Sequence, residues 1–182
     1  MHELTGPKGP AFDEIDWGRP DFEILVSHFH RGVAAISLDE YDAFRRWLDA
    51  FGYRVDTFDM SAGLNVAVPA IGRYFRWEEQ FGYVLGPDRR NLDALDDGFE
   101  MEVPENGLVL EIVDAEVAWK EDPRWFLGLI SIASAHSMRH LALGRRFFTV
   151  LPLPKSSPLI NAAVEQFTIA RTFVPKSILN RY

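Results

Sequence analysis

The chain has 182 residues, of which 47% are hydrophobic, so it can form one domain with a sizeable core but not two independent domains. It contains no cysteine, which excludes a disulfide framework, thiolate metal sites and cysteine nucleophiles, and is compatible with a reducing cytoplasm. A formal charge of −8 argues against nucleic acid as a direct ligand and favours a basic protein as partner, although a solubilising role explains the charge equally well.

The first 20 residues contain three glycines and three prolines, which predict an irregular arm held to the domain by Phe12, Ile15 and Trp17. The start carries no apolar run, and no later stretch approaches the roughly 20 apolar residues needed to cross a bilayer. We therefore expect a cytoplasmic protein with no membrane partner.

Residues 21–52 read as an N-terminal β/α extension of the same domain. Strands are predicted over residues 22–28 and 33–36, around a turn. Ser37 and the Glu three residues later have the spacing of a capping box that opens a helix, and Gly52 is placed to end that helix in a left-handed conformation.

Residues 53–154 carry the pattern of an α/β core. A strand over 53–60 follows the helix closely, and this spacing favours a parallel βαβ unit with a right-handed crossover. Pro69 falls in the first turn of a second helix, predicted over 68–83. The later predicted elements are a buried strand 107–113, a long helix from Asp122 and Pro123 to a Gly144 cap, a last strand 147–153, and, within the C-terminal segment 155–182, a helix 157–172 stopped by Pro175.

The most informative segment is NLDALDDGF, residues 91–99, which predicts a short helix with an acidic face. With about 100° of rotation per residue, Asp93 at 0° places Asp96 near about −60°, Asp97 near about +40° and Glu100 near about −20°. All four carboxylates therefore share one face. The apolar residues Leu92, Leu95 and Phe99 fall on a separate stripe that can dock on a core.

Repulsion among these acids indicates that stability alone does not favour the arrangement. Like charges four residues apart each cost roughly a few tenths of a kcal/mol in an isolated helix. Part of the acid is structural, because Asn91 is a good N-cap and Asp93 lies beside the positive end of the helix. A cationic partner would relieve the repulsion, and a tight anionic patch is what a protein needs to imitate a polyphosphate backbone.

From residue 53 to 153, the order strand, helix, acidic helix, strand, helix, strand resembles the barstar family of ribonuclease inhibitors. The residues that carry the resemblance are Asn91, Leu92, Asp93, Ala94, Leu95 and Asp97, then GLVLEIVDA at 107–115 and RRFFTVLPL at 145–153. The resemblance implies a small parallel sheet packed with helices, in which the acidic helix and its preceding loop plug the active site of a basic ribonuclease. It also implies that Asp93 and Asp97 are contact residues and that Asn91 caps the helix.

Three features depart from the family pattern. Asp96 and Gly98 replace residues that are commonly aromatic and small or thiol-bearing, so we expect a more acidic and less rigid helix. A longer loop brings Arg89 and Arg90 beside the acids and partly neutralises them. The acidic contact that the family places late in its long helix has no counterpart, because residues 139–141 read RHL.

Two alternatives remain open. One is a module of the same fold that binds a non-ribonuclease protein, or forms a homodimer through the segments outside the resemblance. The other is a small metal-dependent enzyme, since His28 with His30 and His136 with His140 have spacings compatible with zinc. Against an enzyme, no Glu follows His136 as in H-E-x-x-H, and neither a phosphate loop nor a G-x-S-x-G motif occurs.

The leading hypothesis is a bacterial, barstar-like inhibitor or immunity protein, an antitoxin that is not an enzyme and needs no cofactor or metal. Its expected partner is a basic ribonuclease or other toxin protein. The predicted partner-binding residues are Asp93, Asp97, Asp96, Glu100, Asn91 and Tyr83, the last as an aromatic anchor at the edge of the loop.

Overall fold

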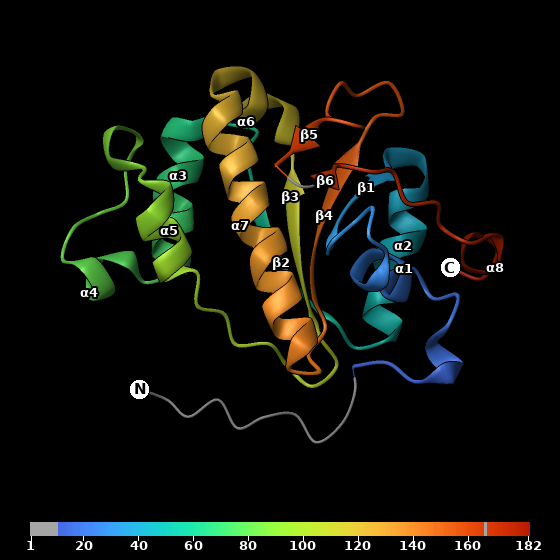
Figure 1. The fold of residues 1–182 in the computed structure, drawn as a ribbon. Helices are drawn as coiled ribbons and strands as arrows, with labels where there is room; N and C mark the ends of the chain where they lie inside the picture. Colours follow the sequence, from blue (N-terminus) through green and yellow to red (C-terminus); the bar gives the residue numbers. More distant parts are fainter. Residues whose placement is uncertain (1–10, 166) are drawn as a thin grey trace.

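A four-stranded, entirely parallel sheet organises the chain, and helices cover both of its faces (Figure 1). The computed structural model describes residues 11–165 and 167–182. In chain order the elements are the 3-10 helix η1 (Glu14–Asp16), α1 (Pro20–Val26), β1 (Val33–Ser37), α2 (Leu38–Ala50), β2 (Arg54–Asp59), α3 (Leu64–Tyr74), α4 (Trp77–Phe81), the 3-10 helix η2 (Pro87–Arg89), α5 (Leu92–Gly98), β3 (Leu108–Val113), α6 (Ala115–Glu121), α7 (Pro123–Ala142), β4 (Phe147–Leu153), β5 (Ala163–Val164), β6 (Phe167–Thr168) and α8 (Lys176–Leu179).

The strand order is β1-β4-β3-β2, which confirms the predicted α/β class with a parallel sheet. The two central strands are apolar almost throughout, as expected for parallel strands with both faces covered: every residue of β4 is buried. β1 and β2 are parallel, but they lie at opposite edges because β3 and β4 separate them. The predicted βαβ unit therefore does not consist of neighbouring strands.

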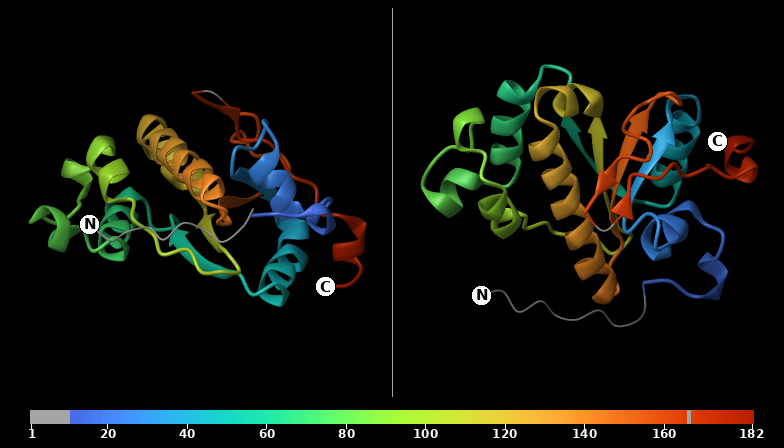
Figure 2. Two further views of the ribbon diagram at one scale, coloured as in Figure 1. Left: turned by 60° about the horizontal axis from the view of Figure 1, so that its bottom comes forward. Right: turned by 45° about the horizontal axis from the view of Figure 1, so that its top comes forward.

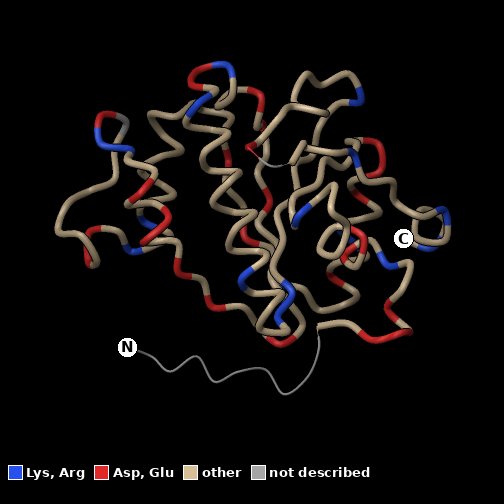
Figure 3. Tube along the Cα trace, viewed as in Figure 1, with Lys and Arg blue, Asp and Glu red and all other residues tan. Residues whose placement is uncertain are grey.

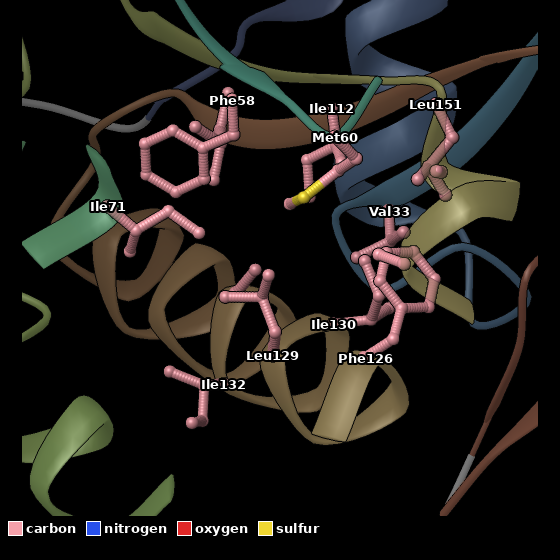
Figure 4. Close-up of a cluster of buried hydrophobic side chains, with 14 of the residues drawn as sticks. Val33, Phe58, Met60, Ile71, Ile112, Phe126, Leu129, Ile130, Ile132 and Leu151 are labelled. Atoms are coloured by element: carbon pink, nitrogen blue, oxygen red, sulfur yellow. The ribbon is translucent and has the colours of Figure 1, made fainter. Parts of the chain in front are cut away.

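The two faces of the sheet have separate cores. Helices α3, α6 and α7 cover one face, with α5 packed against α7, and α1 and α2 cover the other (Figures 1 and 2). On the first face, Phe126, Leu129 and Ile130 of α7 lie fully buried against the strands, close to Met60 and Ile112 (Figure 4). The larger of the two cores thus lies directly beneath the acidic helix α5.

The two edges of the sheet differ. A segment near the C-terminus covers the edge of β1: Ala35 N–H donates to the Ala170 carbonyl at 3.0 Å, and Thr172 N–H donates to the Ala35 carbonyl at 2.9 Å. Within the described residues no strand pairs with the outer edge of β2. That edge carries Arg54 and Asp56, an ion pair of the kind that discourages edge-to-edge association.

The N-terminal segment is held by ion pairs rather than by the three predicted apolar anchors. Ile15 and Trp17 are 87% and 68% exposed, so the prediction that they pin the arm is wrong. Only Phe12 packs on the domain, edge-on to Phe22 with ring centroids 5.4 Å apart. Residues 1–10 of the predicted arm lie outside the described residues.

The charged anchor of this segment, here called the N-terminal ionic cluster, consists of Asp16, Arg19, Asp21, Tyr53 and Arg146. Arg19 donates to Asp21 at 2.7 Å and to Asp16 at 2.5 Å, and Arg146 donates to Asp16 at 3.3 Å. The Tyr53 hydroxyl donates to Asp21, which is fully buried. Each buried carboxylate in this cluster therefore has a charged partner.

Two predicted elements are wrong. Residues 22–26 of the predicted strand 22–28 belong to helix α1, because Pro20 starts a helix whose buried residues Ile24 and Leu25 lie toward the sheet. The predicted helix over 157–172 is a set of turns with the short antiparallel pair β5–β6, so 147–153 is not the last strand. Asn161 and Glu165 have φ values of 70° and 45°, which no continuous α-helix allows. Pro175 precedes α8 rather than ending a helix.

Helix boundaries account for the other corrections. The predicted helix over 68–83 is divided into α3 and α4 at Arg76, whose φ of 50° is left-handed, and Pro69 lies inside α3 rather than in its first turn. Ser37 precedes α2 but makes no capping hydrogen bond, because its hydroxyl donates to Asp39. The capping box with Glu40 is therefore wrong.

The remaining elements are confirmed within one or two residues. These are the strands around 53–60, 107–113 and 147–153, the left-handed ends at Gly52 and Gly144, and the long helix after Asp122. Asp122 accepts a hydrogen bond from Trp125 N–H at 3.0 Å and so caps α7. Among the described residues, no helix combines the length and apolarity required to span a membrane.

Candidate functional site

Helix α5 is fixed to α7 and to the core on the first face of the sheet by the apolar stripe that the sequence predicts. Leu95 and Phe99 are each 1% exposed, and Leu92 packs over Gly128 of α7, where a Cβ atom would clash with it. Gly98 is also buried: a Cβ there would lie 2.9 Å from the Phe81 ring. Its role is therefore close packing against α4, and the expectation of a less rigid helix stays a prediction.

Asn91 caps α5 as predicted. Its Oδ1 accepts a hydrogen bond from Asp93 N–H at 2.9 Å, which satisfies one of the free amides at the helix start. The side chain is exposed but used locally. Asn91 thus holds the backbone of Asp93 in place by a local hydrogen bond.

The four acids do not share one face, so this prediction is wrong for two of them. Asp93 and Asp97 are exposed, and in the described residues neither has an ion-pair partner. Asp96 turns toward α7, where its Oδ1 lies 2.9 Å from His136 Nε2 and 3.8 Å from Arg139 Nη1. Glu100 is exposed but follows the end of α5 at Gly98, so the helical wheel no longer applies to it.

The contact between Asp96 and α7 includes a titratable group, the imidazole of His136. Burial lowers the pKa of His136 from its ordinary value, and the hydrogen bond to Asp96 opposes this shift. The imidazole lies against the Phe99 ring with centroids 4.8 Å apart. Asp96 therefore helps to hold α5 on α7 and contributes less than Asp93 or Asp97 to the exposed charge.

Acidic residues continue beyond α5 along the connection to β3. We call Asp93, Asp97, Glu100, Glu102 and Glu105 the acidic strip; all five are exposed. Figure 3 shows acidic positions following one another down this part of the chain. Sequence reasoning based on one helix missed Glu102 and Glu105. The signal was present, because no Lys or Arg occurs between Arg90 and Lys120.

The two arginines of the loop before α5 have partners outside the acidic strip. Arg90 Nη2 donates to Asp122 Oδ2 of α7 at 2.8 Å. The Arg89 guanidinium lies 6.0 Å from the centre of the Tyr83 ring. Among the described residues Arg90 thus forms an ion pair with Asp122, and neither arginine forms one with Asp93 or Asp97.

Tyr83 is half-buried between aromatic neighbours, not fully exposed. Its ring centroid lies 6.0 Å from that of Trp77 and 6.4 Å from that of Phe81, and Arg89 covers part of what remains. These contacts fix the loop that leads into α5. Tyr83 is thus only partly exposed to a partner.

Among the described residues, the four histidines with zinc-like spacing do not form one metal site. His30 is buried next to the Thr172 hydroxyl, 3.1 Å from Nε2, whereas His28 is exposed. Burial, aided by Arg145 and His136, lowers the pKa of His140 to about 4. In residues 11–165 and 167–182, no group of three or more His, Cys, Asp or Glu residues is placed to hold a metal ion.

Comparison with models of known protein families, with curated proteins and with solved structures found no match.

Proposed function

We propose that this chain is a cytoplasmic, barstar-like inhibitor or immunity protein that binds a basic ribonuclease and blocks its active site with α5. The observation that carries the proposal is the acidic strip, which has five exposed carboxylates and no intervening Lys or Arg. The family resemblance over 53–153 supports it, because the acidic helix lies between the β2–α3 unit and β3 of a parallel sheet.

The inhibition follows from the chemistry of the target. A ribonuclease holds RNA phosphates with Arg, Lys and His side chains. Asp93 and Asp97 are one helical turn apart, so their Cβ atoms are about 5–6 Å from each other and can contact two cationic groups of one active site. Because Leu95 and Phe99 fix α5 on the core, little conformational entropy is lost when the carboxylates bind.

The charge distribution also favours fast association. An acidic strip on a protein with a net charge of −8 attracts a basic protein before contact, which raises the association rate at low ionic strength. An immunity protein requires this, because each uninhibited ribonuclease molecule continues to cleave RNA.

A pull-down from the native host, followed by an RNA-cleavage assay on the captured proteins, tests the proposal. We expect the wild-type protein to capture a basic ribonuclease and to silence it at a one-to-one ratio. The variant D93A/D97A should capture much less of it. D42A, which removes one exposed carboxylate from α2, should behave like the wild type. Capture of a partner without nuclease activity would replace the ribonuclease hypothesis with that of a different protein-binding role.

A further inference from the structure

The C-terminal end of the chain passes around the edge of β1 from one face of the sheet to the other. We call residues 167–182 the C-terminal strap; it comprises β6, the stretch that covers the edge of β1, and α8. Figure 1 shows it running from the β5–β6 pair past β1 to α8, which packs on α2. The strap lies beyond residues 53–153, so the family resemblance does not extend to it.

The buried side chains of the strap belong to both cores of the domain. Ile169 is fully buried in the core that contains α7, whereas Val174 and Ile178, 4% and 8% exposed, belong to the core that contains α2. A copy of the chain without a strap would therefore leave both cores partly uncovered. Some strap must fill this position in every folded molecule.

The main polar contacts of the strap are also with residues outside it. On the edge of β1, its backbone forms the two hydrogen bonds with Ala35 described above. Arg171 forms an ion pair with Glu40 of α2 at 3.5 Å, and the Thr172 hydroxyl lies 3.1 Å from His30 Nε2. None of these contacts requires the strap to belong to the same molecule as β1 and α2.

A single short turn connects the strap to β5. Val164 of β5 lies opposite Phe167 of β6, which leaves a two-residue connection. Its first residue, Glu165, has a φ of 45°, and its second lies outside the described residues. Two-residue hairpin turns with positive φ are normally made by Asn, Asp or Gly, because the left-handed conformation brings the Cβ of other residues too close to the backbone. The closed turn is therefore strained at Glu165, and an extended chain at this position relieves the strain.

We propose that the C-terminal strap exchanges between two copies of this chain, which form a domain-swapped dimer. In the dimer Glu165 is extended, and the strap of each copy pairs with β5 and covers β1 and α2 of the other copy. Because the two straps are identical, every contact described above is retained and only the two strained turns are lost. The partner is a second copy, since no other chain supplies the same strap. This inference goes beyond the proposed function and does not depend on it.

Substitutions at Glu165 test the role of the turn. Glu165→Gly adopts a φ of 45° without steric cost and should favour the closed monomer, whereas Glu165→Pro fixes φ at about −65° and should favour the dimer. The control is Asn161→Gly, because Asn161 also has a positive φ, 70°, but precedes β5 and keeps its conformation in both forms. Sedimentation velocity over a range of concentrations measures the dimer dissociation constant of each full-length protein after refolding at high concentration.

We expect the dissociation constant of the E165G dimer to be about tenfold higher than that of the wild type, and that of the E165P dimer to be lower. N161G should match the wild type. Equal dissociation constants for E165G, N161G and the wild type would overturn the proposal, because a dimer formed through other surfaces does not depend on the turn. A wild-type chain that remains monomeric after refolding at high concentration would overturn it as well.

A disulfide between two variants tests the exchange directly and needs no change at the turn. Ala163 and Thr168 are exposed and lie opposite each other in the β5–β6 pair, and the chain has no cysteine of its own. The Cα atoms of directly opposed residues in antiparallel strands are about 4.5–5.5 Å apart, within the range that a disulfide spans. The variants A163C and T168C carry one cysteine each, so in a closed monomer neither cysteine has a partner.

We expect A163C and T168C, refolded together and then oxidised, to form a disulfide with each other, because β5 of one copy pairs with β6 of the other. The control is the same mixture made after each variant has been refolded alone. The mixed disulfide, measured by mass spectrometry under non-reducing conditions, should be several-fold more abundant in the first mixture. Equal yields would show that the cysteines meet only by collision and would overturn the exchange. No ribonuclease enters either assay, so failure here is distinguishable from failure of the proposed function.

Discussion

The N-terminal ionic cluster and the acidic strip use the same carboxylate groups in opposite ways. In the cluster, Asp21 is fully buried and bonded to Arg19 and Tyr53. In the strip, Asp93 and Asp97 are exposed and, among the described residues, unpaired. Burial and bonding partners, and not the carboxylate group itself, therefore distinguish a structural carboxylate from one available to a partner. Loss of the first should cost stability, and loss of the second should cost only binding.

Removing Asp21 should produce the largest effect on stability. In Asp21→Ala, Arg19 and Tyr53 lose their buried partner, and breaking a buried pair in this way costs about 3–5 kcal/mol. Urea unfolding should show this loss as a lower midpoint with an unchanged slope. Asp97→Ala should stay within about 0.5 kcal/mol of the wild type. Similar midpoints for D21A and D97A would contradict the comparison.

A pH series should extend the comparison to α7, the helix on which α5 packs. His140 has a pKa of about 4 in the folded protein, below its ordinary value of 6.5. Between pH 6.5 and 4 the unfolded chain therefore binds the proton first, and the free energy of unfolding falls as the pH is lowered through this window. The expected loss is about 1–3 kcal/mol.

The matched variant for this series is His140→Leu, which keeps an apolar group against Phe147 and cannot bind the proton. Its free energy of unfolding should fall less than that of the wild type between pH 6.5 and 4. Parallel curves for the two proteins, obtained by urea unfolding at each pH, would show that His140 does not resist protonation.

An effect on stability smaller than that of Asp21 or His140 should come from Asp96, whose environment is intermediate between the two groups. Its side chain is 40% exposed and lies 2.9 Å from His136. Asp96→Asn should therefore lower the free energy of unfolding by less than about 1 kcal/mol, because a partly exposed pair is screened by solvent. A loss as large as that of D21A, measured by the same urea series, would place Asp96 with the structural carboxylates.

The sequence predicted the central fold because its signals there are local. Strands such as 107–113 are continuous apolar runs, and the helix starts at Asn91 and Asp122 depend on side chains two or three residues from the amides they bind. The apolar stripe of α5 was predicted for the same reason. Each of these features depends on residues close together in one helix or strand.

The incorrect predictions concern segments whose structure depends on tertiary contacts. Residues 22–26 belong to helix α1, which packs on the sheet, although the short apolar run at 22–28 is equally compatible with a strand. The pairing of Asp96 with His136 joins residues 40 positions apart, and a helical wheel gives a direction without naming the neighbour. Likewise, nothing local indicated that Arg90 would form an ion pair with Asp122.

The most direct test of the central claim is the affinity of the captured ribonuclease for D93A and D97A, measured at two salt concentrations beside D42A. We predict that each strip variant loses about 2 kcal/mol or more of binding free energy, and that the wild-type association rate falls with added salt. D42A should bind like the wild type. Unchanged affinity in both strip variants, with their fold intact, would contradict inhibition by the acidic strip.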